Sequence, residues 1–254
     1  MKKMIAILAA AMLLWGASAS ADTLDFLKPF WMQMMDGVSN TASGKIPENV
    51  TVTCADERLT VEACGVLLEN DYSAEAHVYA VLKNTGSERL PIRSVQMTVL
   101  GANGNTLHQE NYVSYMPSVV EPGETMLVSE WMYDFVKEIG KVDSIQISVE
   151  TASRVNEKWK QLGDVRAWLD GDYLCVEFTN TTEKTLFGVI CAATVSDANG
   201  QILDMMMQSP YDTDDLGIAQ GSSIVWRKRL EDAATLKIGT DAVCKAWAYR
   251  MEDL

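Results

Sequence analysis

Six methionines in two short clusters have the most distinctive chemistry in this chain. They are Met32, Met34, Met35, Met205, Met206 and Met207. Thioether sulfur is a soft ligand for Cu(I), so clusters of this kind could bind copper. Methionine more often fills gaps in hydrophobic cores, and on a strand Met206 would point to the opposite face from its two neighbours. We therefore predict that these residues serve packing and form no metal site.

The acidic stretch from Asp212 to Gly217 begins like a calcium-binding loop. Such a loop needs oxygen ligands at alternate positions and closes with an acidic side chain that binds through both oxygens. Here Leu216 occupies the fifth position and Ser223 the closing position. We interpret the stretch as an acidic turn.

Residues that could act as a catalytic base are scarce. His77 and His108 are the only histidines, and the sequence contains none of the hydrolase signatures GxSxG, SxxK and HExxH. His77 is expected on an outward strand face and His108 near a hairpin, both as ordinary surface residues. We predict that the protein is not an enzyme and has no catalytic or cofactor-binding residues.

The five cysteines leave the disulfide pattern open. They are Cys54, Cys64, Cys175, Cys191 and Cys244. No two of them form a C-x-x-C pair, and no cysteine–histidine cluster is present, which argues against a zinc site. An odd number in an exported chain leaves at least one thiol unpaired or shared between chains. We expect most of these thiols to act as small buried apolar residues.

The N-terminus predicts export from a bacterial cell. Lys2 and Lys3 precede an apolar run, and Ala19 and Ala21 occupy the small positions of an A-x-A cleavage site. We predict a signal peptide over residues 1–21, with cleavage after Ala21. The apolar run is too short to span a bilayer, which takes about 20 residues, so we expect no membrane span in the mature chain.

The mature chain is strongly acidic. The full chain has a formal charge of −14, and removal of residues 1–21 takes away two lysines and no acid, which gives −16. Such a surface repels the phosphates of nucleic acids, so a nucleic-acid partner is not expected. The acids are scattered along the chain, and we interpret the charge as an aid to solubility.

Residues 22–47 are predicted to form an N-terminal helix and a linker. Leu24, Leu27, Trp31 and Val38 recur at helical spacing, and Pro29 favours a kink or a fresh start. An amphipathic helix could dock on a partner or a membrane, but this one lacks a basic face. We favour packing on the protein's own first domain.

The sequence contains an internal repeat. Residues 83–107 correspond to residues 179–203 at a constant offset of 96, and the identical pairs include Asn84 and Asn180, Leu90 and Leu186, Val99 and Val195, and Gly104 and Gly200. Further on, Gly123 corresponds to Gly221, and Asp143–Ile145 to Asp241–Val243, at an offset of 98. We interpret the pattern as a tandem duplication of a domain of about 95 residues, a size that suits one core.

Each copy shows the alternation of half-buried strands. Val78, Ala80 and Leu82 alternate with more polar residues, and so do Val95 and the residues at 97 and 99. Asn-Gly pairs at 103–104 and 199–200 predict tight hairpin turns. Each copy offers six or seven short strands with the turn spacing of a small β-sandwich.

Two self-contained sandwiches joined by a connector follow from this pattern. We predict a first domain over residues 48–151, a connector over residues 152–163 and a second domain over residues 164–254. In the connector, Val155, Trp159 and Leu162 would share one helical face. We interpret it as a short helical or extended segment.

The order of these motifs resembles the small immunoglobulin-type modules of exported bacterial proteins, in particular the FxLYD-type domain. The resemblance rests on a strand followed by "KNTG" or "TNTT", a second strand, "ANG", and the turn "PGE", and it covers about residues 59–150 and 164–250. It implies an all-β fold of two tandem immunoglobulin-like β-sandwiches, an extracellular or envelope location, and no established chemistry. In such sandwiches Cys175 and Cys244 could form the bridge between the sheets, although Cys175 alternates with the inward set of its strand.

The sequence thus favours an exported, non-enzymatic binding or envelope-associated protein. The expected partner is a protein or a component of the cell envelope, with no cofactor. The alternative is an exported protein that handles copper or calcium, or a hydrolase whose acids and methionines only the fold brings together.

Overall fold

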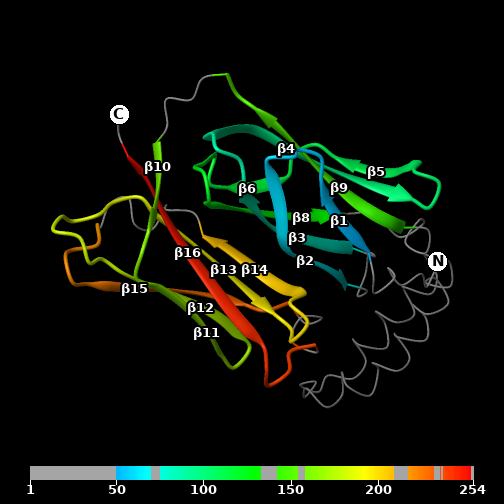
Figure 1. Ribbon diagram of the computed structural model, residues 1–254. Coiled ribbons are helices and arrows are strands. Elements are labelled where there is room, and N and C mark those ends of the chain that lie inside the picture. The colour runs from blue at the N-terminus through cyan, green and yellow to red at the C-terminus, as the bar shows by residue number, and fades with distance from the viewer. Residues whose placement is uncertain are drawn as a thin grey trace, which may run out of the picture. The chain divides into compact units, whose positions relative to one another are not determined.

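The structure is a computed structural model (Figure 1) that describes residues 50–69, 75–132, 142–153, 158–208, 217–231, 235 and 237–252. The chain is all-β as predicted, because these residues form sixteen strands, β1 to β16. Gly44–Leu254 form one compact unit. The predicted signal peptide, residues 1–21, and the predicted helix and linker, residues 22–47, lie outside the described residues. Within the described ranges, no helix has the length and hydrophobicity needed to cross a membrane.

The first half, residues 50–153, contains two sheets. Its strands are β1 (Thr51–Cys54), β2 (Leu59–Glu69), β3 (Glu75–Asn84), β4 (Leu90–Gly101), β5 (Thr106–Glu110), β6 (Ser114–Met116), β7 (Val119–Val120), β8 (Thr125–Met132) and β9 (Val142–Thr151). One sheet has the order β1-β9-β4-β5, with β7 paired to β4, and the other has the order β2-β3-β8-β6. Buried side chains from both sheets, such as Val78, Met97 and Ile145, form one core cluster. This is the packing of a β-sandwich.

The second half, residues 158–252, repeats the arrangement. Its strands are β10 (Lys158–Leu162), β11 (Val165–Asp170), β12 (Tyr173–Thr179), β13 (Val189–Ser196), β14 (Ile202–Gln208), β15 (Ser223–Arg229) and β16 (Val243–Glu252). The two sheets have the orders β10-β16-β13-β14 and β11-β12-β15. The pairing of β4 with β9 returns as that of β13 with β16, and the pairing of β3 with β8 returns as that of β12 with β15.

The predicted alternation is confirmed along β4. Val95, Met97 and Val99 are buried, whereas the residues between them, Gln96 and Thr98, are partly exposed. Successive side chains of a strand point to opposite faces, so one set reaches the core and the other faces outward.

Asn84 and Asn180 have the same role in the two halves. Each is fully buried. The side-chain nitrogen donates to two backbone carbonyls, and the side-chain oxygen accepts from the backbone N–H two residues ahead. The partners of Asn84 are Glu88, Val120 and Gly86, and those of Asn180 are Lys184, Ile218 and Thr182. The repeated Asn-Thr motif therefore holds a loop to the strand pair that follows it, and its function is structural.

The Asn-Gly turns are confirmed at the glycines. Gly104 has a φ of 72° and Gly200 a φ of 83°, while their asparagine neighbours keep a negative φ. The hairpin closes when the amide of Gly101 donates to the carbonyl of Asn105, and the amide of Asp197 to that of Gln201. A glycine adopts this left-handed conformation without the steric cost that a Cβ would bring.

The offset predicted for the last strand is wrong by one residue. At an offset of 98, Val243 would correspond to Ile145, yet Val243 is 49% exposed and Ile145 is fully buried. The pairing of β13 with β16 places Cys244 opposite Val195, just as β9 places Ile145 opposite Val99. The offset of β16 is therefore 99, because one further residue precedes this strand in the second half.

The connector contains a strand. Lys158–Leu162 form β10, which pairs antiparallel with β16. The helical interpretation of this part is wrong, and the extended one holds for the described residues. Trp159 and Leu162 do not share one face of a helix, because they lie on an edge of the β16 sheet. Val155 lies outside the described residues.

Strand β3 is buried on both faces, contrary to the prediction of a half-buried strand. Val78, Ala80 and Leu82 point into the core of the first half as expected. The side chains on the other face, His77, Tyr79 and Val81, are also buried. The prediction that His77 is a surface residue is wrong, because the second half covers this face.

Candidate functional site

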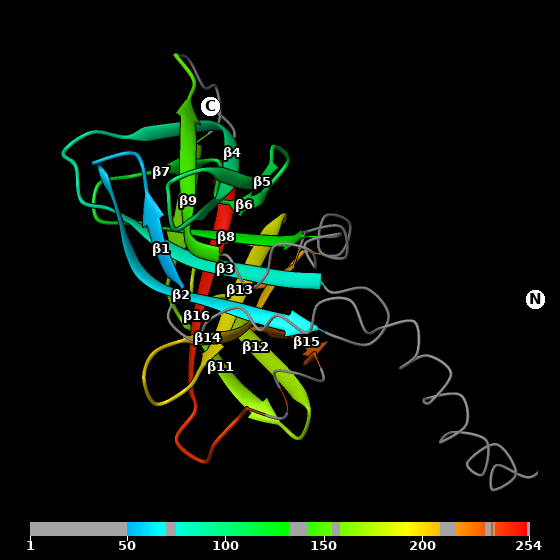
Figure 2. The ribbon, with the colours of Figure 1, turned by 90° about the vertical axis from the view of Figure 1, so that its right-hand side faces the viewer.

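A seam joins the two halves, and it holds the most extensive buried polar cluster among the described residues. Leu67, Tyr79, Val81 and Leu127 of the first half belong to the same hydrophobic cluster as the core of the second half. In Figure 2, β2 and β14 lie side by side, and β14 also contacts β3. The expectation of two self-contained sandwiches did not include this shared cluster.

Gly65 allows the closest approach across the seam. A Cβ placed on Gly65 would lie 1.8 Å from the carbonyl oxygen of Ile202 and 2.7 Å from its carbonyl carbon. No real Cβ comes so near to backbone atoms. The backbones of β2 and β14 can meet here only because this position has no side chain.

Asp204 is the centre of a buried polar cluster at the seam. Its side chain is fully buried, and Oδ1 accepts hydrogen bonds from Lys228 Nζ at 2.5 Å and from the Tyr79 hydroxyl at 3.2 Å. The backbone amides of Met205 and Glu231 donate to the carboxylate at 2.7 Å and 3.3 Å. Four donors thus compensate one buried negative charge, as a buried carboxylate requires.

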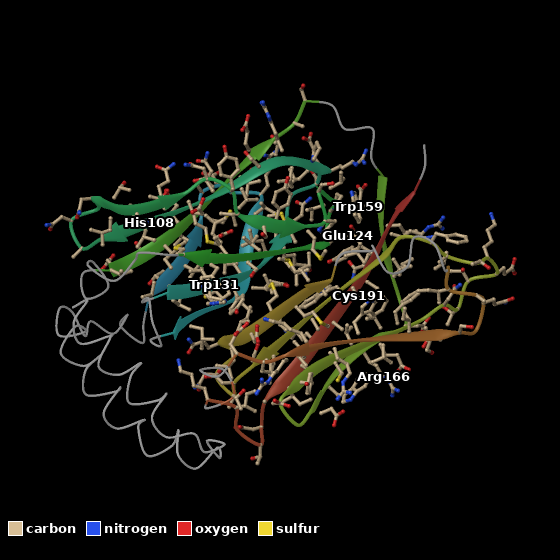
Figure 3. The ribbon with its side chains drawn as sticks, turned by 180° about the vertical axis from the view of Figure 1, so that it is seen from behind. His108, Glu124, Trp131, Trp159, Arg166 and Cys191 are labelled. Carbon is tan, nitrogen blue, oxygen red and sulfur yellow. The ribbon has the colours of Figure 1, made fainter. Side chains whose placement is uncertain are left out.

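The cluster continues into the first half through aromatic residues. The Tyr79 hydroxyl lies 3.1 Å from His77 Nδ1, and the His77 ring lies 4.1 Å from the Trp131 ring, centroid to centroid. Figure 3 labels Trp131 on β8. Tyr79 donates its single hydroxyl proton to Asp204, so its oxygen is left to accept in the contact with His77. The chain of contacts therefore runs from β8 of the first half to β15 of the second.

Two more hydrogen bonds cross between the halves. The Tyr249 hydroxyl donates to the carbonyl of Thr125 at 2.9 Å, and burial raises the pKa of Tyr249, so it stays protonated. Trp159 Nε1, labelled in Figure 3, donates to Ser118 Oγ at 2.8 Å. The halves are held at three separate places, which makes the seam a structural joint.

The outward residues that meet at the seam are mostly apolar or aromatic in the second half, and the exception, Thr194, is a threonine in both copies. Ala192 and Thr194 of β13 and Met205 of β14 are buried, although the core of their own half lies on the other side of the sheet. Trp247 and Tyr249 of β16 share this face.

The counterparts of this face in the first half are polar. They are Gln96, Thr98, Gln109, Ser148 and Glu150. All five are partly or fully exposed. The two copies have thus diverged at the positions that decide which face is covered.

On the other sheet the difference is reversed: the first half has buried residues at the seam, and the corresponding residues of the second half are mostly charged or polar. In register, His77, Tyr79, Val81, Leu127, Ser129, Trp131 and Gly65 correspond to Tyr173, Cys175, Glu177, Val225, Arg227, Arg229 and Trp168. We name the outward side of β11, β12 and β15 the arginine face; it consists of Arg166, Trp168, Asp170, Tyr173, Cys175, Glu177, Val225, Arg227 and Arg229.

Ion pairs and ring contacts cover the arginine face. Arg166 pairs with Glu177 and lies over the Trp168 ring at 5.3 Å, and Figure 3 labels it on this sheet. Arg227 pairs with Asp170 at 2.6 Å and lies over the Tyr173 ring at 4.6 Å.

Arg229 pairs with Asp172 at 3.0 Å at the end of the same face. Cys175, which pairs in register with Trp168 and Arg227, is only 1% exposed beneath these side chains. The face is therefore charged at its surface and closed below it.

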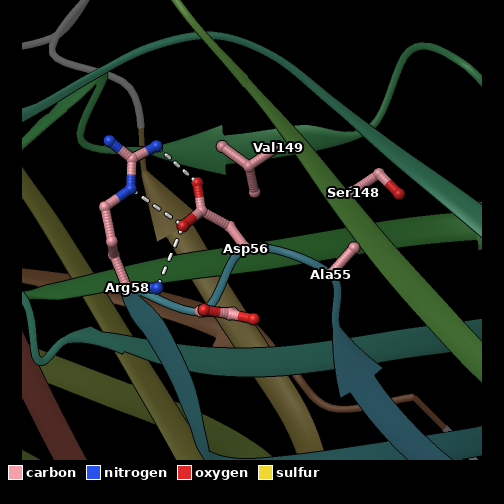
Figure 4. A pocket seen from close by; sticks show the side chains of 6 residues that line it. Ala55, Asp56, Arg58, Ser148 and Val149 are labelled. Atoms are coloured by element: carbon pink, nitrogen blue, oxygen red, sulfur yellow. Dashed lines mark hydrogen bonds and ion pairs between the residues drawn. The ribbon is translucent and has the colours of Figure 1, made fainter.

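An open cavity lies at the turn between β1 and β2 (Figure 4). It has a volume of about 550 Å³ and is lined by Ala55, Asp56, Glu57, Arg58, Ser148 and Val149. Arg58 binds the Asp56 carboxylate through Nε at 2.9 Å and Nη2 at 2.6 Å, and this hydrogen bonding lowers the pKa of Asp56 below its usual value. None of the seam residues lines the cavity. The charged part of its lining consists of this ion pair and Glu57.

The predicted methionine cluster of the second half is used for packing. Met205 and Met206 are both buried in the shared cluster, and Met207 packs against it. No group of three or more potential metal-binding acids, histidines or cysteines occurs in the described ranges. Met32, Met34, Met35 and most of the acidic turn, residues 212–216, lie outside the described residues.

All five cysteines are described, and each is a free thiol. Burial raises the pKa of Cys191, which lies inside the core of the second half. Cys175 points to the arginine face, whereas Cys244 packs against the core, so the two thiols lie on opposite sides of the β12 sheet. The bridge that the resemblance allowed between them is not formed.

Comparisons with known proteins add no identity. No protein-family model and no curated protein matches the chain. Among solved structures, it is similar to a transglutaminase from red sea bream, with 12% identity over 78% of this chain and 30% of that chain and a TM-score of 0.22. It is also similar to a mutant oxalate decarboxylase from Bacillus subtilis, with 9% identity over 85% of this chain and 80% of that chain and a TM-score of 0.13. Scores this low carry no argument about fold or activity.

Proposed function

We propose that the protein is an exported, non-enzymatic interaction module that presents sheet faces to a partner in the cell envelope. The observation that carries the proposal is how its buried polar side chains are used. Asn84 and Asn180 hold loops, and Asp204 with Tyr79 holds the two halves together. Among the described residues, what remains exposed is a set of sheet faces and turns, which suits binding rather than catalysis.

The fold that we propose is a tandem pair of immunoglobulin-type sandwiches related to the FxLYD-type modules. The recurrence of the same strand pairs and the same asparagine hydrogen bonds in both halves supports it. The export signal over residues 1–21 supports a place outside the cytoplasm. A shared core between the halves suits a module that holds its binding faces at a fixed separation.

Affinity capture tests this function. The chain, purified and immobilised, is incubated with an envelope extract of the producing organism, and the bound proteins are cross-linked and identified by mass spectrometry. We expect a protein retained at a stoichiometric ratio, and native mass spectrometry of the purified chain should show no bound copper or calcium. Stoichiometric metal, or turnover of envelope substrates by the pure chain, would instead establish the metal-handling or hydrolytic alternative.

A further inference from the structure

The arginine face is the second-half counterpart of the face through which the first half binds its neighbour. Tyr79 and Val81 lie at the seam, and Cys175 and Glu177 occupy the same positions of the repeat. Leu127 is fully buried at the seam, while its counterpart Val225 is 47% exposed. One copy of this sheet surface is therefore occupied by a folded β-sheet, and the other is not occupied by any described residue.

Another copy of the chain cannot occupy the arginine face in the same way. Gly65, which lets the Ile202 backbone approach at the seam, is replaced in register by Trp168. An indole at this position fills the space that the close approach needs. The chain also carries a formal charge of −14, which opposes association between copies. Repeat proteins close their ends in a similar way, with terminal units that differ from the inner ones.

The residues that replaced the seam residues are the types that are enriched at protein interfaces. Arginine, tryptophan and tyrosine are enriched at protein interfaces, whereas lysine and glutamate are depleted there. The arginine face contains Arg166, Trp168, Tyr173, Arg227 and Arg229. Each of the two ring contacts places a guanidinium over an aromatic ring, 5.3 Å from the Trp168 centroid and 4.6 Å from the Tyr173 centroid, which restricts the arginine side chain before binding.

In two of the three ion pairs of this face the arginine is the more exposed partner. The side chain of Arg166 is 74% exposed and that of Glu177 18%, and Arg229 is 70% exposed against 42% for Asp172. In the third pair Arg227 is 51% exposed and Asp170 62%, so both of its charges reach solvent. Exposed ion pairs contribute little to stability, so an incoming carboxylate can replace the internal one. A guanidinium binds a carboxylate through two parallel hydrogen bonds.

We propose that the arginine face binds a protein partner through a segment that carries carboxylates beside aromatic or apolar side chains. The carboxylates pair with Arg166 and Arg227, and the apolar side chains cover Val225 and the Trp168 ring. The inference rests on the proposed binding function and names the surface and the chemistry of the partner.

A random peptide library tests the proposal although the partner is unidentified. Twelve-residue peptides displayed on phage are selected on the purified chain, and the most enriched peptide is synthesised with a fluorescent label. We expect enrichment of aspartate and glutamate together with aromatic residues. Fluorescence anisotropy should show binding that weakens as salt is raised.

Paired arginine variants then locate the binding face. The double variant Arg166→Ala and Arg227→Ala should bind the peptide at least tenfold more weakly. The matched control is Arg89→Ala with Arg93→Ala, which removes two exposed, ion-paired arginines from the first half and should change the affinity less than twofold. Circular dichroism shows whether each variant is folded. If the double variant does not fold, the single variant Arg227→Ala takes its place in the binding measurement.

Each other outcome would overturn the proposal in a recognisable way. Peptides without acidic enrichment, or no enriched peptide at all, would show that the face only closes the end of the molecule. Acidic peptides that bind both double variants equally would keep a binding function but place it elsewhere. Binding of vesicles that contain phosphatidylglycerol, lost only in the Arg166 and Arg227 variant, would assign the face to lipid. Self-association in sedimentation that the same variant abolishes would assign it to a second copy.

Discussion

At the scale of single residues, the side chains that look most like a functional motif are structural. The Asn-Thr pair recurs at an offset of 96, and in each half the buried asparagine uses its side-chain amide to join backbone groups of two separate segments. Both amide protons of each asparagine are used and the side chain is fully buried, so a ligand cannot reach it. A motif that is repeated within a chain can therefore reflect a structural requirement of the fold and need not indicate a functional site.

Replacement of Asn180 tests this role. Asn180→Ala removes the hydrogen bonds of the buried amide to the carbonyls of Lys184 and Ile218 and from the amide of Thr182, although Thr182 Oγ1 still donates to the Lys184 carbonyl and the Leu186 amide to that of Ile218. Each lost hydrogen bond contributes about 0.5–1.5 kcal/mol, so we expect a loss of about 2–4 kcal/mol in the free energy of unfolding, measured with urea. Asn103→Ala, in the exposed turn, should change it by less than about 0.5 kcal/mol. Equal effects would mean that the buried amide is dispensable.

The ion pair of Asp56 and Arg58 predicts a dependence on pH. The pKa of Asp56 lies below its usual value of 3.8 because Arg58 donates hydrogen bonds to the carboxylate. A depressed folded pKa contributes stability that is present above the unfolded pKa and lost as the pH falls through the folded pKa.

Titration of Asp56 by NMR checks this prediction. In Arg58→Ala the pKa of Asp56 should rise toward 3.8, and the share of the stability that is lost on acidification through Asp56 should disappear, because its folded and unfolded pKa values then nearly coincide. Arg93→Ala, which removes an arginine of β4 that is paired with Glu150 of β9, should leave the pKa of Asp56 unchanged. A pKa of Asp56 that is the same in both variants would contradict the assignment.

At the scale of elements, the alternation of β4 could be predicted from the sequence and the burial of β3 could not. Val95, Met97 and Val99 reach the core of their own half, so period two is visible in a single strand. His77 and Tyr79 are buried by the other half of the chain, and no local pattern encodes a contact between distant segments.

A comparison of the two copies would have revealed the seam. Outward positions that are apolar in one copy and polar in the other, such as Trp247 against Ser148 and Tyr249 against Glu150, mark a covered face. The one-residue slip of β16 hid this signal, because an offset of 98 aligns outward positions with inward ones. The repeat pattern alone did not show which residues of β16 correspond to those of β9. The pairing of β16 with β13 shows it.

A side chain at Gly65 should destabilise the contact between β2 and β14. Gly65→Ala places a Cβ where the Ile202 backbone lies, so β2 and β14 must separate. We expect a loss of about 1–3 kcal/mol, as for overpacking in a core. Gly163→Ala is the control, because nothing lies within 4 Å of a Cβ at that position. Thermal and urea unfolding of both variants provide the measurement, and equal stability of the two would place the seam further apart than described.

At the scale of the whole molecule, the seam predicts that both halves unfold together. They share one hydrophobic cluster and the Asp204 carboxylate, which accepts from Tyr79 of the first half and Lys228 of the second. Loss of one half would expose apolar residues of the other, and loss of the first half would remove one of the four donors to Asp204. We expect a single transition in differential scanning calorimetry, with a calorimetric enthalpy equal to the van't Hoff enthalpy.

Removal of the shared charge should weaken this coupling. Asp204→Asn keeps the size of the side chain but removes the negative charge to which Lys228 and Tyr79 donate. Breaking a buried ion pair of this kind costs about 2–4 kcal/mol when one partner is partly exposed. With Tyr79→Phe in addition, the transition should broaden or divide, since one half then melts before the other. Asp170→Asn, which removes the exposed partner of Arg227, should keep one transition with a loss below about 1 kcal/mol. Two separate transitions in the unaltered chain would show instead that the halves are independent and that the seam carries no part of their stability.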